Sequence, residues 1–545
     1  MYLAESILRH GTGSQGRRGR TIGLVSILTV FVAGVGYLRE AALAARFGLS
    51  SSMDAYFGAL FIPIMLSTML IAGTLSPVFI PILLEDEKTG DFGKLSETFS
   101  IVTNFVLLFL CGIVSCALLT AHQWVSLLFP GFNPETASAT QQLVIIIFPS
   151  IIFVAMAGIL TATLNGFHKF ALASFAPALS SIAVILAVVL ARGGKALYFV
   201  GVATAVGFLL QFLLLIPATA ALGIRYKMTL SLHHPAVRKL CRLGGPLLAY
   251  LVTANASSLV ERNLASQLSA GAVSTLTYAI RLFTVPSNFL AAPLGIVMYP
   301  QFAREALRER HGDLALQVSR IFRVALFVFV PITVWTITNS LPITRLLYER
   351  GHFQLENSLI TSQVLRLYSI GILPLAVGGI LLRCFYAVQD TVTALKAEAI
   401  DLVFYLIAAP FMSHHFGVLG LAFTRGISFY LVCGILVFVL WRHKRLLKFD
   451  TDLARFVAST ILASVVMGGV SRIAWNFLQS LFDAGGTFVR SGVVGVLLLI
   501  SASVFVGIAR LLNLSEVESI LRTVLTIASS NRGRNPDVAP VSVGE

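Results

Sequence analysis

The chain has 545 residues, of which 57% are hydrophobic and 12% are charged. A soluble globular protein carries about 25% charged residues, so the composition excludes a soluble fold and indicates a protein that crosses a membrane many times. The net charge of +15 does not indicate nucleic acid as a partner, because the basic residues lie at the ends of apolar segments, as the positive-inside rule requires.

Apolar segments long enough to span a hydrocarbon core of about 30 Å follow one another along almost the whole chain. Helices satisfy their own backbone hydrogen bonds in lipid at such lengths, so we predict an all-α polytopic membrane protein with about 14 transmembrane helices. The first apolar segment is too long for a signal peptide. The predicted spans are residues 21–47, 54–84, 95–121, 136–167, 171–191, 197–222, 237–268, 272–302, 315–340, 357–388, 392–412, 418–441, 453–478 and 488–511.

An internal repeat with a separation of about 220 residues relates the two halves of the chain. Pro63 and Pro286 lie in similar patterns, and Gly158-Ile159-Leu160 is repeated as Gly379-Ile380-Leu381. Six helices per half give both halves the same orientation, so we predict two parallel six-helix lobes with a substrate site between them near the midplane. The predicted domains are an N-terminal segment 1–20, a lobe 21–222, a linker 223–236, a second lobe 237–441, two peripheral C-terminal helices in 442–512 and a tail 513–545.

The basic residues of the loops predict the orientation in the membrane. With a cytoplasmic N-terminus, 20 Lys and Arg residues lie on the cytoplasmic side and 5 on the other, which is the expected bias. An even number of spans then places the C-terminus in the cytoplasm as well. We expect a multi-pass protein of the bacterial cytoplasmic (inner) membrane.

Two arginines, Arg39 and Arg281, lie inside predicted spans in corresponding halves. A charge at the bilayer centre costs about 2.5 to more than 10 kcal/mol, so such side chains normally face a water-filled cavity or a charged partner. Two cations in one interior indicate a cavity for an anion. The alternative for Arg39 is an ion pair with a neighbouring acid.

Further charged and hydroxyl side chains lie within later spans. Glu261 and Arg262 point about 100° apart on a helix, so we expect one of them to face the cavity; the alternative is an ion pair with Arg281 or with another helix. Asp401 and Thr424, together with Glu261, offer oxygen ligands for a small cation such as sodium, and the alternative is that a neighbouring arginine neutralises Asp401.

Motifs for other chemistry are absent from the sequence. The five cysteines have no metal-ligand spacing and are read as small hydrophobic residues, so no metal site and no cofactor is predicted. A P-loop, a nucleotide-binding fingerprint and a nucleophile elbow are all missing. We therefore expect a transporter, not an enzyme, with Na+ or H+ as the coupling ion.

Several motifs resemble the MurJ/MviN lipid II flippase family of the multidrug/oligosaccharidyl-lipid/polysaccharide exporter superfamily. The motifs are Gly36-Tyr37-Leu38-Arg39-Glu40, Arg46-Phe47-Gly48, Asp54-Ala55-Tyr56, Leu164-Asn165-Gly166-Phe167-His168-Lys169-Phe170, Phe175-Ala176-Pro177, Arg281-Leu282, Pro286-Ser287, Phe385-Tyr386-Ala387 and Gln389-Asp390-Thr391. The resemblance implies fourteen helices, a V-shaped cationic cavity between two lobes, and a peripheral groove at the last two helices. It also implies that Arg39 and Arg281 bind substrate and that Glu261, Asp401 and Thr424 approximate a sodium site.

The chain departs from the family pattern at several cavity positions. Typical members have arginines in the second helix, where this chain has Ser67 and Thr68, and often another in the first helix, where it has Ala33. We predict that Ser67 and Thr68, with Glu261 and Arg262, contribute to substrate binding beside the two arginines. A cavity with fewer cations would hold a pyrophosphate less firmly, or hold a different head group.

The functional hypothesis is a lipid-linked oligosaccharide flippase that moves the undecaprenyl-pyrophosphate peptidoglycan precursor, lipid II, from the cytoplasmic to the periplasmic leaflet by alternating access. The alternatives are a flippase for an exopolysaccharide or another envelope glycan lipid, a drug/cation antiporter, and an integral-membrane glycosyltransferase. The expected partners are the lipid-linked glycan, membrane lipids and the cell-wall synthesis machinery, and the protein is expected to act as a monomer.

Overall fold

The computed structural model describes residues 15–69, 76–87, 91–307, 311–447 and 450–514. Residues 1–14 of the predicted N-terminal segment and residues 515–545 of the predicted tail lie outside these ranges. The helices of the first half are α2 (Gln15–Phe47), α3 (Ser51–Thr68), α4 (Ser76–Glu87), α5 (Phe92–Leu119), α6 (Ala121–Leu128), α7 (Pro134–Ile147), η2 (Phe148–Ser150), α8 (Ile151–Gly166), α9 (Phe170–Phe175), α10 (Pro177–Leu190) and α11 (Ala196–Ala220).

The second half begins after residues 221–234, which connect α11 to α12. Its helices are α12 (Pro235–Ser266), α13 (Ala272–Phe283), the π-helical turn η3 (Ser287–Ala291), α14 (Ala292–Leu307), α15 (His311–Thr338), α16 (Ser340–Tyr348), α17 (Leu355–Ser369), α18 (Ile372–Ala387) and α19 (Thr391–Arg442). The chain continues into α20 (Thr451–Ala484) and α21 (Thr487–Leu511).

Local capping explains where several helices begin. The Ser50 hydroxyl accepts a hydrogen bond from the Met53 N–H at the start of α3. The Asn133 side chain accepts one from the Thr136 N–H at the start of α7, with Pro134 in the first turn. Such side chains satisfy N–H groups that have no partner within the helix, and proline is tolerated there because it lacks that group.

The all-α class is confirmed, but the count of fourteen spans is not. In the described part of the chain, nine helices are long and apolar enough to cross a membrane, or ten when the bent pair α17–α18 counts as one span. That pair covers a single predicted span and is bent by 43°. The predicted spans 392–412 and 418–441 correspond to the two segments of α19, which are separated at Gly417, a non-helical residue with a φ of 58°.

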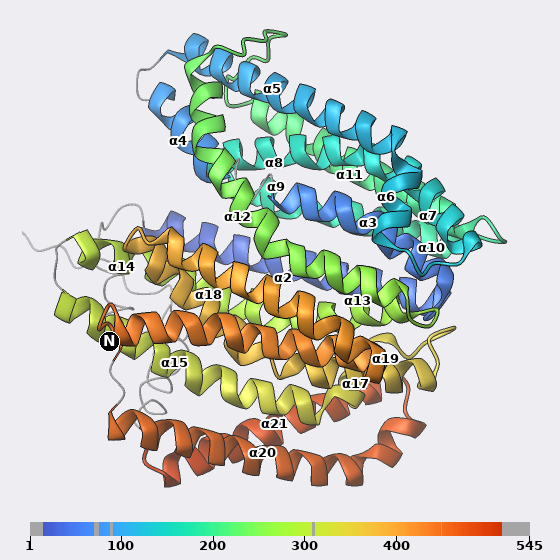
Figure 1. Ribbon diagram of the computed structural model, residues 1–545, viewed down its shortest axis with the longest axis vertical. Coiled ribbons are helices and arrows are strands. Elements are labelled where there is room, and N and C mark those ends of the chain that lie inside the picture. Colours follow the sequence, from blue (N-terminus) through green and yellow to red (C-terminus); the bar gives the residue numbers. More distant parts are fainter. Residues whose placement is uncertain (1–14, 70–75, 88–90, 308–310, 448–449, 515–545) are drawn as a thin grey trace, which may run out of the picture.

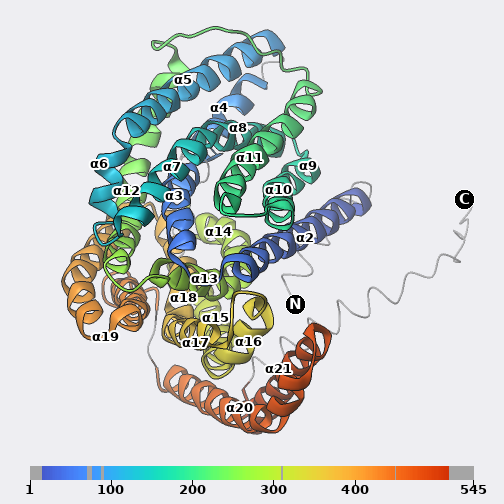
Figure 2. The same cartoon turned by 90° about the vertical axis from the view of Figure 1, so that its right-hand side faces the viewer.

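The two halves of the chain occupy different parts of the molecule (Figure 1). Helices α3 to α11 form the upper part, α12 crosses from this part to α13, and α13 to α19 form the middle. The last two helices, α20 and α21, pack against each other at the lower edge, where α20 lies along α15 (Figures 1 and 2). This arrangement agrees with the predicted division into two lobes and a peripheral C-terminal pair, although it does not test the predicted boundaries.

A charged and aromatic cluster holds the C-terminal pair against α16. Arg345 forms ion pairs with Glu349 and Asp483, both at 2.6 Å, and Arg490 lies 3.2 Å from Glu349. Both guanidinium groups lie over the Phe482 ring, at 5.0 and 5.1 Å from its centroid. Cation–π contacts of this kind add to the ion pairs, so we call these five residues the Phe482 clamp.

Candidate functional site

The two predicted cavity arginines meet at one carboxylate. The Arg39 Nη2 atom donates to Glu40 Oε1 at 2.6 Å, and the Arg281 Nε atom lies 3.5 Å from the same oxygen. Arg39 and Glu40 are neighbours on α2, and Arg281 belongs to the last turn of α13. The residues therefore bring two cations and one anion together between the halves, with a formal charge of +1.

The members of this triad differ in exposure. The Glu40 side chain is 3% exposed, that of Arg39 17% and that of Arg281 39%. Burial without a partner is costly for a charge, so Glu40 is held by the two guanidinium groups. Among the described residues the buried Arg39 Nε has no hydrogen-bond partner. Arg281 thus has free surface with which to contact a ligand, and the triad is not neutral.

Two features of the backbone near Arg281 hold α13 beside α2. The Tyr37 hydroxyl on α2 donates to the Arg281 carbonyl at 3.3 Å, which ties the two helices together beside the triad. After Arg281, α13 ends and the π-helical turn η3 follows. Single π-helical turns within helices are frequent at functional sites, and this one includes Ser287, next to Pro286 of the internal repeat.

Glu261 lies in a separate buried group. Its Oε1 atom accepts hydrogen bonds from the hydroxyls of Tyr368 at 2.8 Å and Tyr405 at 3.1 Å. Its Oε2 atom lies 3.7 Å from Arg425 Nη2, and the Arg425 guanidinium lies 4.6 Å from the Tyr405 ring centroid. The expected ion pair with another helix is therefore present, and it is formed with α19 and not with Arg281.

Arg262 points to a different set of neighbours from Glu261, as the 100° rotation predicts. Its Nη1 atom donates to the Val273 carbonyl at 3.0 Å and to the Thr277 hydroxyl. The guanidinium lies 5.3 Å from the Phe61 ring centroid, and the residue is only 9% exposed. The structure thus places Arg262 in a packed contact between α12, α13 and α3.

Asp401 has two hydroxyl partners. Ser257 of α12 donates to Asp401 Oδ2 at 3.1 Å, and Ser428 of α19 donates to Oδ1. Thr424 lies one turn before Ser428 on the same helix and donates to the Gly420 carbonyl at 2.8 Å. The structure therefore groups Asp401 with two serines, whereas Glu261 has its own tyrosine and arginine partners.

Ser67 and Thr68 lie at the end of α3, and both hydroxyls donate to the Ile64 carbonyl, at 2.8 and 2.9 Å. Ser67 is buried and Thr68 is exposed. Among the described residues, neither hydroxyl has a hydrogen bond to the triad, so their part in substrate binding stays a prediction.

The halves are in close contact at the end of the bundle where α2 ends and α3 begins. There the Asp54 carboxylate of α3 accepts hydrogen bonds from the backbone N–H groups of Gly271 and Ser274, each at 2.7 Å. These groups are at the start of α13, where unpaired N–H groups and the helix dipole favour an anion. Asp54 is 3% exposed. We call this region the closed end.

Glycines allow the backbones to approach at the closed end. A Cβ on Gly131 would lie 2.3 Å from the Gln267 Cα, and a Cβ on Gly351 would lie 2.3 Å from the Ala45 carbonyl oxygen. Gly351 also has a φ of +56°, a conformation that side chains disfavour. The Asn263 side chain adds a hydrogen bond of 2.9 Å to the Leu127 carbonyl.

We expect Asp54→Ala to open the closed end. The change removes two hydrogen bonds to a charged acceptor, each worth about 1.5 to 3 kcal/mol. Spin labels on Ser52→Cys and Ser269→Cys, both exposed in this region, should show longer distances by pulsed electron resonance. Asp54→Asn keeps one acceptor oxygen, so its distances between the spin labels should lie between those of the wild type and those of Asp54→Ala. Unchanged distances in both variants would show that Asp54 does not hold this end together.

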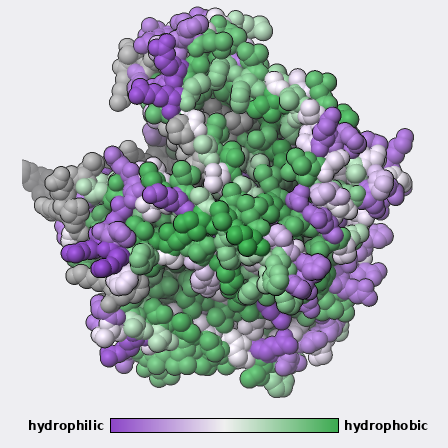
Figure 3. All heavy atoms as spheres, in the orientation of Figure 1, coloured by the Kyte–Doolittle hydropathy of each residue, from purple (hydrophilic) through white to green (hydrophobic). Residues whose placement is uncertain are grey.

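The surface at the opposite end is hollowed. Figure 3 shows an indentation at the left, between the region of α4, α5 and α12 and the region below it. An apolar pocket of about 170 Å³ lies between α3, α5, α8 and α12, lined among others by Leu66, Phe109 and Leu248. The molecule is thus closed at one end and indented at the other, which is the arrangement expected of a transporter whose site faces one side.

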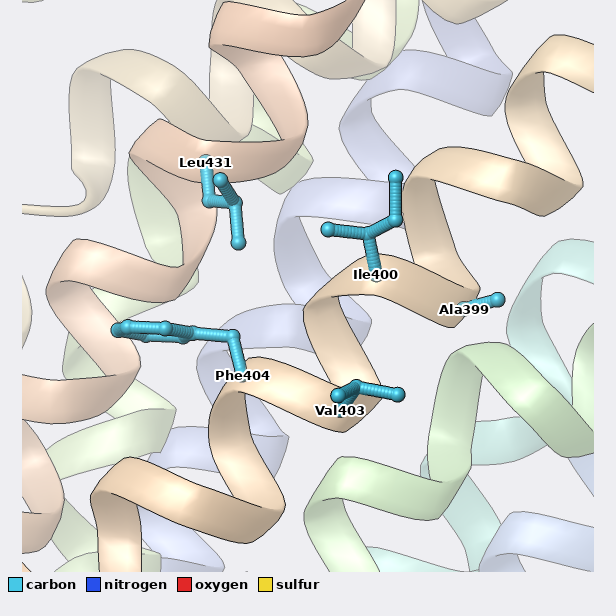
Figure 4. A pocket seen from close by; sticks show the side chains of 5 residues that line it. All are labelled: Ala399, Ile400, Val403, Phe404 and Leu431. Carbon is cyan, nitrogen blue, oxygen red and sulfur yellow. The ribbon is translucent and has the colours of Figure 1, made fainter.

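A second apolar space lies away from the arginines. Ala399, Ile400, Val403, Phe404 and Leu431 line a cavity of about 460 Å³ between the two segments of α19 (Figure 4). Its lining contains no charged or polar side chain, so it offers no group that would bind a phosphate or a sugar. The charged groups described above thus lie outside this space.

The comparisons with known proteins agree with one another. The model of the family described as "Lipid II flippase MurJ" matches residues 43–491. The chain belongs to the MurJ family. A probable lipid II flippase MurJ from Rhizobium tropici is 25% identical over 507 residues, covering 90% of this chain and 93% of the relative. The lipid II flippase MurJ of Burkholderia cenocepacia is 26% identical over 467 residues, covering 83% and 89%.

A solved structure supports the fold of this MurJ family member. The lipid II flippase MurJ in an inward closed conformation matches with a TM-score of 0.75 and 23% identity, covering 90% of this chain and 98% of that chain. The family consists of transporters, and its membership together with the apolar helices makes this chain a polytopic inner-membrane protein.

In this MurJ family chain, the alternative expected for Arg39, an ion pair with a neighbouring acid, is present: the acid is Glu40, which Arg281 shares. Such a pair follows from the cost of burying a charge without a partner. Two other residues of the site were not expected: Asp54, which joins the halves, and Arg425, which neutralises Glu261. Asp54 gave no comparable signal, since its partners are backbone groups more than 200 residues away.

Proposed function

We propose that this chain moves lipid II, the undecaprenyl-pyrophosphate peptidoglycan precursor, from the cytoplasmic to the periplasmic leaflet by alternating access. Family membership and the names of the relatives support this substrate. The observation that carries the proposal is the triad, in which one buried carboxylate serves two guanidinium groups. The remaining positive charge is complementary to a pyrophosphate.

The chemistry of the triad suits such a head group. A guanidinium binds phosphate oxygens through paired, charge-assisted hydrogen bonds that an ammonium group cannot reproduce. Arg281, with 39% of its side chain exposed, would make the first contact. Glu40 holds the Arg39 guanidinium in place and limits the charge that must be buried before the ligand arrives. The sugars would lie in the hollow between the halves, and the prenyl chain would stay in lipid.

Transport then requires the closed end to open. The Asp54 hydrogen bonds to the start of α13 would break while contacts form at the opposite end, so that the triad faces the other leaflet. If the empty triad moves a net positive charge, an inward-negative potential favours its return by about 2.3 kcal/mol per charge per 100 mV. The cycle would need no nucleotide.

A binding and complementation experiment separates this proposal from its alternatives. The purified protein should bind lipid II in native mass spectrometry, and the gene should sustain growth when the resident lipid II flippase of a host bacterium is depleted. If the protein binds a different polyprenyl-pyrophosphate glycan and fails to sustain growth, the envelope-glycan alternative is correct. Export of organic cations that persists in Arg281→Ala would instead support a drug antiporter.

For coupling, we propose that a sodium ion binds at Asp401. The donors at this place are a carboxylate and the hydroxyls of Ser257 and Ser428, with Thr424 one turn away, and hard cations prefer oxygen ligands. Glu261 fits less well, because the Arg425 cation lies 3.7 Å from it. The Asp401 group lies on α12 and α19, so an ion there would link two helices of the second half.

Sodium should raise the thermal transition of the purified wild type by about 1 to 3 °C at ten times its dissociation constant, compared with an equal concentration of choline. Asp401→Asn should abolish this rise, because the carboxylate charge is gone. Asp452→Asn, an exposed position in the first turn of α20, should keep it. A sodium-dependent rise that survives in Asp401→Asn would place the ion elsewhere, and no rise in the wild type would favour protons.

A further inference from the structure

The segment that connects the two halves is fastened to the outside of α5. Ser96, Ser100 and Asn104 lie four residues apart on α5 and therefore form one stripe along it. Ser96 Oγ accepts a hydrogen bond from the Arg225 N–H at 3.0 Å, and Ser100 Oγ accepts one from the Lys227 N–H at 2.9 Å. The contacts extend over about 12 Å of helix, at 1.5 Å per residue.

Asn104 completes the attachment. Its Nδ2 atom donates to the carbonyls of Lys227 at 3.2 Å and Thr229 at 2.7 Å, and its Oδ1 atom accepts from the Tyr226 hydroxyl. A segment outside the helices has unpaired backbone groups that cannot be left in an apolar environment without a partner. The α5 stripe supplies these partners. We call residues 224–232 the strap.

The ends of the strap are fixed to the core of the first half. Ile224 is 5% exposed and belongs to the same buried cluster as Leu95 and Phe99 of α5. Beyond the strap, Ala236 and Leu240 of α12 belong to this cluster as well. The connection is therefore not a loose linker, and it follows the first half over its whole length.

The outer side of the strap is apolar at every second residue. Tyr226 and Leu230 are each 51% exposed, Leu232 is 55% exposed and Met228 is 93% exposed. These four residues alternate with polar ones along the strap, and we call them the apolar row; the backbone turns at Met228, where the Thr229 N–H donates to the Lys227 carbonyl at 2.8 Å. A row of large apolar side chains this exposed indicates a surface that is covered by a partner.

The residues beside the strap indicate that the partner covering it is lipid. Leu108 is the next residue on the α5 stripe after Asn104, and it is apolar and 53% exposed. The stripe on α5 thus changes from polar to apolar beyond Asn104, where the contacts with the strap end. An exposed apolar residue at this position of a membrane protein is suited to contact with lipid. Figures 1 and 2 place the connection between α11 and α12 at the upper edge of the molecule, at the end opposite α20 and α21.

Charges of the strap complement an anionic surface. Arg225 and Lys227 are exposed, and among the described residues neither has an ion-pair partner. Basic residues beside a span are attracted to anionic lipids of the cytoplasmic leaflet, and tyrosine is enriched at membrane interfaces. The apolar row is therefore suited to the acyl region of a lipid leaflet, and the two cations are suited to its anionic head groups.

We propose that the strap is a membrane-interface segment that lies in the head-group layer of the cytoplasmic leaflet. Met228, Leu230 and Leu232 enter the acyl region, Tyr226 stays at the interface with its hydroxyl on Asn104, and Arg225 and Lys227 contact anionic head groups. The first half is thereby held at a fixed depth in that leaflet. Rotation between the halves is then taken up after the strap, at His233–Pro235, where α12 begins. This inference does not depend on the identity of the transported lipid.

Spin-label accessibility in vesicles of phosphatidylethanolamine and phosphatidylglycerol tests the proposal. Single cysteines replace residues 226 to 232 in turn, in full-length protein in which the five native cysteines have been replaced. Labels at Met228 and Leu230 should collide several-fold more with oxygen than with a water-soluble nickel chelate, as a label at Leu108 should. Labels at Lys227 and Thr229 should show the reverse preference.

A label at Lys195, an exposed residue between α10 and α11, provides the aqueous reference. Chelate accessibility at Met228 and Leu230 equal to that at Lys195 would overturn the proposal. In Arg225→Gln/Lys227→Gln the labels should move toward the aqueous values; no change would show that charge plays no part in the contact. Asn104→Ala should release the strap and sharpen the spectrum at Met228, and size-exclusion elution identical to the wild type confirms that this variant is folded.

Discussion

Arg281→Ala should weaken binding of lipid II about 10- to 100-fold and abolish complementation. Hydrogen bonds to charged groups contribute about 1.5 to 3 kcal/mol each, and the variant also leaves Arg39 and Glu40 as a neutral pair. Arg281→Lys keeps the charge but loses the planar, paired geometry, so its affinity should lie between those of the alanine variant and the wild type. The affinities are measured by native mass spectrometry, and growth is measured in the depleted host.

The matched control is Arg366→Ala. Arg366 is an exposed arginine of α17, and its loss changes the net charge of the protein by the same amount. It should bind lipid II and complement as the wild type does. Equal affinities of the Arg281→Ala and Arg366→Ala proteins would contradict the assignment of the triad as the head-group site.

Glu40→Ala should destabilise the protein more than any single change at an exposed charge. Removing one member of a buried ion pair costs about 3 to 5 kcal/mol, because the partner charge is left buried without compensation. Here the Arg39 guanidinium would lose its 2.6 Å contact, and the positive charge of Arg281, which shares the same carboxylate oxygen, would be left unbalanced as well. The expected result is a clear fall in the thermal unfolding temperature of the purified protein, measured by intrinsic fluorescence.

A double variant shows whether the loss comes from unbalanced charge. In Arg39→Leu/Glu40→Leu both charges are gone, and an apolar pair in place of a buried ion pair is often neutral for stability. The thermal transition should return most of the way to the wild-type value, while lipid II binding stays weak. A double variant as unstable as Glu40→Ala would mean that packing, and not charge, sets the effect.

Hydropathy was sufficient to predict the all-α class, because a lipid environment leaves a chain few ways to pair its backbone groups. It could not predict every break. The predicted span 357–388 is two helices joined at a 43° bend, whereas the predicted spans 392–412 and 418–441 are separated at Gly417, within the predicted gap. A hydropathy profile averages over many residues, and these features depend on the conformation of one or two.

The arginines of the site were predictable from the cost of burying charge, and the structure brings both to Glu40. Their partners were less predictable. A helical span places each residue at a known angle on its own axis, but the sequence does not state which neighbour that angle faces. Glu261 was therefore grouped with Asp401, whereas the structure gives it Tyr368 and Arg425.

The Phe482 clamp fixes the C-terminal helix pair to the second half. Arg345 and Arg490 hold one end of α20 and α21 to α16, and at the other end Arg323 of α15 lies 3.6 Å from Asp450, which caps α20. Helix α20 is thus attached to the second half at both ends, and α21 is attached at the end that carries Arg490. A prenyl tail resting against them would keep the same protein neighbours throughout transport, so only the polar part of the cargo would need to change its surroundings.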